Sequence, residues 1–203
     1  MAYSQFTLEK IKIDLGYQIV ETFGTFKDIP IGVASPFLIE LLGKFMPLAL
    51  SIDTEKARSE FIVAPILFEL KSLLKNRVSL FSGREFNVDV DLGLTGYCDF
   101  LVSQSSEQLL IEAPVLALVE AKNDNISSGL GQCMAEMVAA QIFNDRKGHP
   151  IEWIYGVVTT GTNWKFLRLR DRAIEVDLNE YFLSDLGQLL GILQYCVKRD
   201  LIE

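Results

Sequence analysis

The spacing of hydrophobic residues along this chain of 203 residues changes from a helical to a strand-like period near residue 78. Before that point, Ser35 and Pro36 precede apolar residues spaced four apart, a pattern typical of a helix start with a capping residue and a first-turn proline. Pro47 lies near the expected end of this helix, because a proline in a helix removes one hydrogen bond. The sequence therefore predicts a helix from Ser35 to about Leu50.

A second helix is predicted from Asp53 or Thr54, either of which can cap it, through roughly Leu74. Pro65 falls inside this segment and should kink or interrupt the helix. The segment from Thr7 to Leu15 mixes apolar and charged residues in a way that fits either a short helix or an irregular strand.

After Val78, apolar and polar residues alternate in short runs separated by turn residues, which is typical of strands. The expected strands lie within 78–92, interrupted by a turn at Gly83, and at 97–102, 115–121, 153–159 and 164–169. Helical spacing recurs at about 130–143 and about 184–199. This order of helices and strands predicts an α/β fold with a central mixed β-sheet flanked by helices.

The composition fits one domain over residues 1–203, with a helical N-terminal extension over 1–53. At 49% hydrophobic and 23% charged residues, the chain can bury a substantial core. It shows no signal peptide and no apolar stretch long enough to cross a bilayer, so we expect a cytoplasmic protein that does not bind membranes. The three cysteines lack paired spacing, which fits a reducing compartment.

The net charge of −8 repels nucleic acid at long range and counts against a protein that coats DNA. It leaves room for a metal-dependent enzyme with a local basic groove, because the metal supplies part of the charge. His149 is the single histidine, whereas zinc proteases and multi-histidine hydrolases need at least two. No serine stands in a G-x-S-x-G turn, so nucleophilic hydrolases also lose support.

Charged residues stand where the pattern predicts strands with buried faces. Asp99 lies in the strand at 97–102, and Glu120 and Lys122 end the apolar run of the next strand. Residues two apart in a strand project from one face, so Glu120 and Lys122 share a face. Because a hairpin can bring Asp99 beside Glu120, we expect these carboxylates and the main-chain carbonyl of Ala121 to bind Mg²⁺ or Mn²⁺.

A divalent ion at this position would polarise a phosphodiester and lower the pKa of its bound water, and Lys122 has the reach to orient that water. The predicted reaction is therefore hydrolysis of a phosphodiester bond. The alternative is structural: Glu120 and Lys122 form an ion pair at a strand end, and Asp99 starts a turn.

Cys98-Asp99, a linker of roughly twenty residues and Glu120-Ala121-Lys122 together resemble the split motif of the PD-(D/E)XK nuclease superfamily. Cysteine stands where the motif often has proline. The resemblance covers approximately Thr54 to Arg170 and implies a restriction-endonuclease-like core in the order αβββαβ, with the aspartate, glutamate and lysine of the motif as catalytic residues. Within the superfamily the chain is similar to uncharacterised nuclease-like proteins whose second core helix carries Gly-x-x-Gln.

Two further residues gain a catalytic role through this resemblance. Many members carry a glutamate on the first core helix that approaches the metal, often through water, and Glu60 occupies the matching place, on the apolar side of its helix. The alternative is a surface partner for Lys56 or Arg58. Some members place a glutamine on the second core helix, where Gln132 would orient Lys122 or the substrate, unless it is a surface amide.

One basic stretch accompanies the strand predicted at 164–169. Lys165, Arg168 and Arg170 lie there beside aromatic residues and could contact nucleic-acid phosphates or bases. The alternative is a solvated strand face that protects a sheet edge from aggregation.

The sequence thus predicts a Mg²⁺- or Mn²⁺-dependent nuclease acting on DNA or RNA. The alternative is a catalytically silent or partner-dependent protein that keeps the nuclease fold. The apolar faces of the helices at 35–50 and 186–197 leave room for a homodimer or a partner protein.

Overall fold

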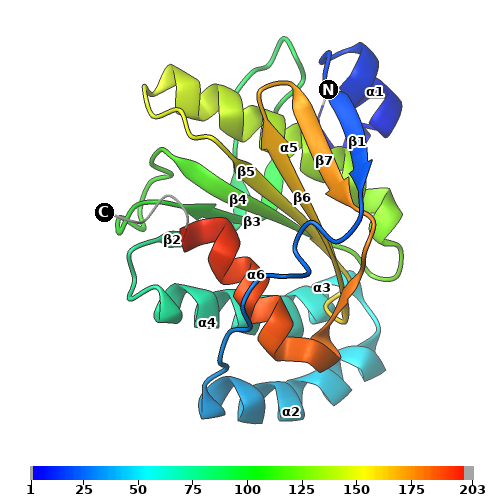
Figure 1. Cartoon of the computed structure of the whole chain (residues 1–203), viewed down its shortest axis with the longest axis vertical. Helices are drawn as coiled ribbons and strands as arrows, with labels where there is room; N and C mark the ends of the chain where they lie inside the picture. Colours follow the sequence, from blue (N-terminus) through cyan, green and yellow to red (C-terminus); the bar gives the residue numbers. More distant parts are fainter. Residues whose placement is uncertain (1, 199–203) are drawn as a thin grey trace.

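The computed structural model describes residues 2–198, which form a mixed eight-stranded sheet with helices on both faces (Figure 1). The strands are β1 (Gln18–Thr22), β2 (Ser79–Glu85), β3 (Tyr97–Ser103), β4 (Val115–Ala121), β5 (Ile154–Thr159), β6 (Asn163–Arg170), β7 (Ala173–Asp177) and β8 (Tyr181–Phe182). The helices are α1 (Leu8–Ile13), α2 (Pro36–Ile52), α3 (Glu55–Arg58), α4 (Ala64–Leu73), α5 (Ile126–Arg146) and α6 (Leu186–Lys198), with shorter turns η1 (Tyr3–Gln5), η2 (Ser59–Val63) and η3 (Leu183–Asp185). The predicted α/β class with a mixed sheet is confirmed.

The strand order across the sheet is β1-β7-β6-β5-β4-β3-β2, with β8 paired to β6. β2, β3 and β4 are antiparallel neighbours, whereas β4 and β5 run parallel. The parallel step follows from α5, which carries the chain along one face of the sheet between these two strands. The carboxyl ends of β4 and β5 therefore meet at the same edge, where open α/β sheets commonly bind ligands.

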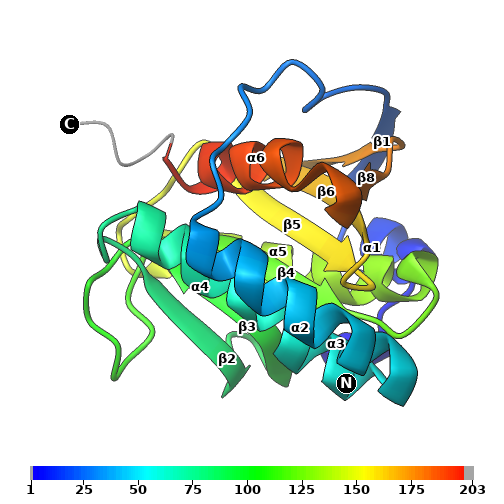
Figure 2. The same ribbon diagram turned by 90° about the horizontal axis from the view of Figure 1, so that it is seen from below.

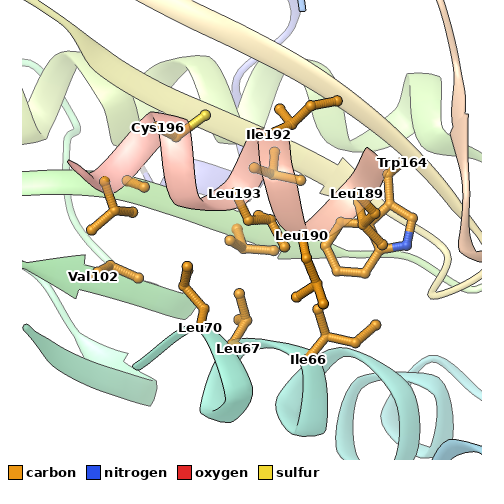
Figure 3. Packing of buried hydrophobic residues seen from close by; sticks show 14 of the residues in the cluster. Ile66, Leu67, Leu70, Val102, Trp164, Leu189, Leu190, Ile192, Leu193 and Cys196 are labelled. Carbon is orange, nitrogen blue, oxygen red and sulfur yellow. The ribbon is translucent and has the colours of Figure 1, made fainter. Parts of the chain in front are cut away.

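The sheet separates two apolar layers. α5 packs on one face together with α1 and η1, while α4 and α6 cover the other face and α2 lies outside α4 (Figures 1 and 2). Figure 3 shows Leu67 and Leu70 of α4 directed towards Leu190 and Leu193 of α6, with Trp164 of the sheet at one end of the cluster. α6 buries its apolar face in this layer and is therefore not free for a partner.

The helix predicted from residue 54 to 74 is divided into three parts. α3 ends at Arg58, a π-helical turn spans Ser59–Val63, and α4 begins at Ala64 with Pro65 in its first turn. The interruption expected at Pro65 thus lies just before the proline, which has no N–H to donate and is tolerated at a helix start. Because a π turn contains an extra residue, it rotates the side chains that follow α3.

Other boundaries differ from the sequence-based predictions. α2 continues past Pro47 to Ile52, since Pro47 is exposed and water can reach the carbonyl of exposed Gly43 that loses its helical donor. The prediction of a second strand in the later part of 78–92 is wrong. After β2 ends at Glu85, only an isolated bridge between Asp89 and Leu94 forms before β3 begins. The C-terminal helix ends at Lys198, and residue 199 of the predicted helix lies outside the described residues.

The N-terminal extension also contains a strand that the sequence did not reveal. β1 pairs in parallel with β7 and places residues 18–22 in the same sheet as the rest of the chain. Both faces of β1 are largely exposed, so no alternation of apolar residues marks it. No helix within residues 2–198 is long and apolar enough to span a membrane.

Candidate functional site

Asp99, Glu120 and Lys122 come together at the edge where β4 and β5 end. β3 and β4 are paired with Phe100 opposite Val119, so the next position places Asp99 beside Glu120. Asp99 Oδ2 accepts a hydrogen bond of 2.9 Å from the main-chain N–H of Ala121, which holds this carboxylate against the end of β4. The hairpin predicted from the sequence therefore forms and unites the two acids.

Glu120 is the most unusual of these residues because its carboxylate is buried. Its side chain is 2% exposed; Oε1 accepts a hydrogen bond from the ammonium of Lys122, and Oε2 has no hydrogen-bond partner. Burial, and after it the negative charge of Asp99, raise the pKa of Glu120 to about 8. A buried acid with a free oxygen is costly unless a cation or proton compensates it.

Lys122 lies at the end of β4 between two glutamates. Its main-chain N–H donates to the carbonyl of Thr159 at 2.7 Å, and its ammonium is 4.0 Å from Glu55 Oε2 as well as paired with Glu120. Burial acts to lower the pKa of Lys122, but the hydrogen bond to Glu120 and the charges of Glu120, Glu55 and Asp99 together outweigh burial and raise the pKa. The side chain therefore stays an ammonium ion at neutral pH.

α5 approaches Lys122 closely because Gly129 has no side chain. A Cβ at this position would lie 2.7 Å from Val158 Cγ1 and 3.1 Å from Lys122 Cε. These distances are shorter than van der Waals contact, so glycine is needed for the helix to pack over Lys122.

The glutamate that reaches Lys122 from the first core helix is Glu55, not Glu60. Glu60 lies in the π turn, is exposed and pairs with Lys56 at 3.0 Å, which is the surface arrangement left open as the alternative. The predicted position on the apolar side is not found, because the spacing of a regular helix does not apply in the wider turn. The sequence analysis did not consider Glu55. Its position directly after Thr54, the capping residue of α3, already placed it in the first turn of that helix.

Gln132 is half-buried on α5 and its amide donates to Glu136 Oε1 at 3.1 Å. Glu136 is fully buried, and its Oε2 has no partner. Burial raises the pKa of Glu136 well above its usual range, and the charge of Glu120 adds to the effect. The structure thus brings Gln132 to the site and adds a second buried glutamate that the sequence analysis did not weigh.

A polar cleft of about 360 Å³ opens next to Lys122. Arg58, Asn123 and Thr160 line it, together with the first turn of α5. Arg58 donates to the carbonyl of Thr160 at 3.2 Å and pairs with Asp53 at 3.0 Å, while Arg58 Nε and Asn123 Oδ1 have no partner. Unused polar atoms beside a charged site give this cleft the character of a binding surface for a polar ligand.

The three basic residues of β6 contact other residues of the protein, and the sequence pattern did not predict these contacts. Lys165 is buried and donates to the main-chain carbonyl of Leu178 at 3.1 Å. Arg168 pairs with Glu175 and stacks over Trp153, 4.3 Å from the ring centre. Arg170 stacks on the same ring at 4.4 Å and pairs with Glu152. The charges of Arg168 and Arg170 are thus paired with glutamates, and the predicted contact of the three residues with nucleic acid stays a prediction.

Known proteins offer no identification. No family model matches the chain, and no curated protein is significantly similar to it. The chemistry of the site is therefore inferred from its own side chains.

The carboxylate oxygens at the site are of the type that binds a divalent cation. Glu120 Oε2 and Glu136 Oε2 are buried oxygens without partners, and Asp99 lies beside Glu120, which fits an ion that prefers oxygen ligands. Among residues 2–198, no three acidic, histidine or cysteine side chains already converge on one point that could hold a metal. Glu120 must exchange its contact with Lys122 before it can bind a cation through both oxygens.

Proposed function

We propose that this protein is a Mg²⁺- or Mn²⁺-dependent nuclease that hydrolyses phosphodiester bonds of DNA or RNA. The observation that carries the proposal is the cluster of Asp99, buried Glu120 and the Lys122 ammonium at the joint edge of β4 and β5, with Glu120 Oε2 unpartnered. A purely structural ion pair would not require the second oxygen of Glu120 to remain unsatisfied in the interior.

The order of elements around this cluster supports the proposal. The helical segment α3–α4 is followed by the antiparallel strands β2, β3 and β4, then by α5, and then by β5 parallel to β4. The resemblance to the PD-(D/E)XK superfamily implies the order αβββαβ, and this succession of elements supports that part of the proposal. The acids also stand at the corresponding places, near the start of the second of the three strands and the end of the third.

Each side chain has a role that follows from its position. Asp99 and Glu120 would hold the cation, with the main-chain carbonyl of Ala121 as a third oxygen and the Ala121 N–H fixing the orientation of Asp99. The bound ion would act as a Lewis acid on the phosphate and on a water molecule. The Lys122 ammonium, kept protonated by Glu120, would orient the attacking water and stabilise the negative charge that develops.

The cleft beside Lys122 gives the substrate strand a path to the site. Arg58 is its one lining residue with a permanent positive charge, and Asn123 directly follows Lys122 in the chain. A phosphate that contacts Arg58 would therefore lie in the cleft that Asn123, the residue after the lysine, helps to line. Asp124 and Glu180 also line the cleft, so a phosphate there would depend on Arg58 together with the charge of the bound ion.

The proposal is tested by a cleavage panel with duplex DNA, single-stranded DNA and RNA in the presence of Mg²⁺ or Mn²⁺. We expect the wild-type protein to cut at least one of these substrates and the chelator EDTA to stop the reaction. Asp99→Asn and Lys122→Ala should each lower the rate by a factor of about 100 or more, a typical loss when one stabilising group is removed.

Lys56→Ala is the matched control for Lys122→Ala. Lys56 is an exposed lysine on α3 that pairs with Glu60, so its loss should leave cleavage unchanged. Unchanged turnover in Lys122→Ala would remove this lysine from the mechanism. Binding of Mn²⁺ without cleavage of any substrate would replace the nuclease by the alternative, a silent or partner-dependent protein of the same fold.

The expected cytoplasmic location and a homodimer or partner protein stay part of this proposal. The outer face of α2 exposes Phe37 and Ile39, which are available for such a contact.

A further inference from the structure

Glu136 lies in the middle of α5 and has no explanation in the packing of the protein. It is fully buried, and only one of its carboxyl oxygens, Oε1, has a partner, the amide of Gln132. An apolar residue would fill this position at lower cost, because a buried oxygen without a hydrogen bond costs about 1–3 kcal/mol. A group that the folded protein holds at such a cost requires a compensating ligand or proton.

Glu136 faces the acidic cluster from the opposite side of the β4–α5 interface. α5 packs over this part of the sheet: a Cβ at Gly129 would lie 2.7 Å from Val158 Cγ1, and a Cβ at Gly156 would lie 2.9 Å from Cys133 Sγ. Val158 and Gly156 are the register partners of Glu120 and Leu118 in β4. Glu120 Oε2 is likewise buried and unpartnered. Two unpartnered carboxyl oxygens are thus buried where α5 packs on β4, one from the strand and one from the helix.

The surrounding residues leave oxygen as the ligand type. The buried side-chain atoms of this region that lack a hydrogen-bond partner are carboxylate oxygens, those of Glu120 and Glu136, and oxygen ligands suit Mg²⁺ and Mn²⁺. Three carboxylates and one ammonium, that of Lys122, would leave two negative charges if all were ionised. A divalent cation balances that charge.

We propose that Glu136 supplies a third carboxylate to the cation site begun by Asp99 and Glu120, binding through Oε2 from the α5 side. This inference rests on the proposed function, since it concerns the same ion. Gln132 becomes a positioning residue: its amide holds Glu136 Oε1 and leaves Oε2 directed to the ion. Because Lys122 now occupies Glu120 Oε1, the ion has to draw the carboxylates together as it binds.

Binding of Mn²⁺ to the whole protein tests the assignment without reference to cleavage. Titration calorimetry and electron paramagnetic resonance of free Mn²⁺ would be applied to the wild type, Glu136→Gln and Glu120→Gln. We expect Glu136→Gln to raise the dissociation constant for Mn²⁺ at least tenfold, while circular dichroism shows the same fold. Glu136→Asp retains the charge on a shorter side chain and should restore part of the affinity.

The matched control is Glu69→Gln. Glu69 is also a buried carboxylate on a helix, but Ser35 donates to both of its oxygens, and it should not affect Mn²⁺ binding. Unchanged Mn²⁺ affinity in Glu136→Gln, together with loss of affinity in Glu120→Gln, would overturn the role of Glu136 and leave the proposed function standing. A wild-type protein that binds no Mn²⁺ at millimolar concentration would overturn both.

Discussion

Replacing Glu120 by glutamine should make the metal-free protein more stable at alkaline pH and change little in mild acid. Burial raises the pKa of Glu120 to about 8 in the folded protein, whereas a glutamate in an unfolded chain titrates near about 4.3. Between these values the folded protein holds a proton that the unfolded chain releases. The free energy of unfolding of the wild type therefore falls as the pH rises through this window.

The size of the effect follows from the shift. From about pH 5 to about pH 8 the folded protein holds the proton over roughly 3 pH units, each worth about 1.4 kcal/mol, so Glu120 costs on the order of 4 kcal/mol. Glu120→Gln has no such proton to hold. The difference in unfolding free energy between the variant and the wild type should therefore grow by about that amount across the window. Loss of the Glu120 charge also relieves Glu136, which acts in the same direction.

Urea unfolding monitored by circular dichroism, in EDTA and at several values from about pH 5 to about pH 9, measures this difference. Glu69→Gln is the control, and its effect on the free energy of unfolding should have the opposite sign. Ser35 N and Oγ donate to the Glu69 carboxylate at 2.7 and 2.9 Å, so replacing this carboxylate by an amide should destabilise the protein by about 1–3 kcal/mol. A Glu120→Gln difference that stays constant or shrinks with rising pH would refute the reasoning. Saturating Mn²⁺ should stabilise the wild type and not the variant.

Gly129→Ala should destabilise the protein by about 1–3 kcal/mol in urea unfolding, because its Cβ would lie 2.7 Å from Val158 Cγ1. The control is Gly43→Ala in the exposed part of α2, where the Cβ meets no atom within 4 Å; it should stabilise the protein by up to about 1 kcal/mol. Equal effects of the two would contradict the close approach of α5. Glu55→Gln should weaken cleavage in the panel assay and Glu60→Gln should not, because only Glu55 reaches the lysine of the site; the reverse ranking would restore the prediction for Glu60. Arg58→Ala should lower the affinity for nucleic acid and reduce its salt dependence by about one ion, measured by fluorescence anisotropy at several salt concentrations, and an unchanged salt slope would exclude a phosphate contact.

Much of the local structure could be predicted because neighbours in the chain determine it. Ser35 Oγ accepts from Leu38 N at 3.1 Å and Thr54 Oγ1 accepts from Ala57 N at 3.2 Å, so both predicted helix caps form from residues three apart. β4 follows the predicted bounds because its run of apolar residues is buried on both faces. The proximity of Asp99 and Glu120 was also accessible, since it needs only a hairpin between consecutive strands.

Contacts between distant segments could not be read from the sequence. β1 joins the sheet beside β7, more than a hundred residues later, and its exposed faces carry no alternating pattern. Glu60 turned away from the site because the π turn changes the side-chain directions, and no local pattern distinguishes that turn from a regular helix. The neutralisation of Arg168 depends on Glu175 in the neighbouring strand.

The sequence by itself determined most of the element types, the α/β class and the acid–lysine cluster, because each depends on short-range spacing. Only the tertiary structure decided that Glu55 is the helix glutamate near Lys122 and that Glu136 is fully buried on α5 with one oxygen unpartnered. Those positions depend on how closely α5 packs over the sheet. Gly129 permits this packing because it has no side chain, and the residues that it contacts, Lys122 and Val158, come close to it only when the chain folds. The energy of burying a carboxylate is set by its surroundings, and the surroundings exist only in the folded protein.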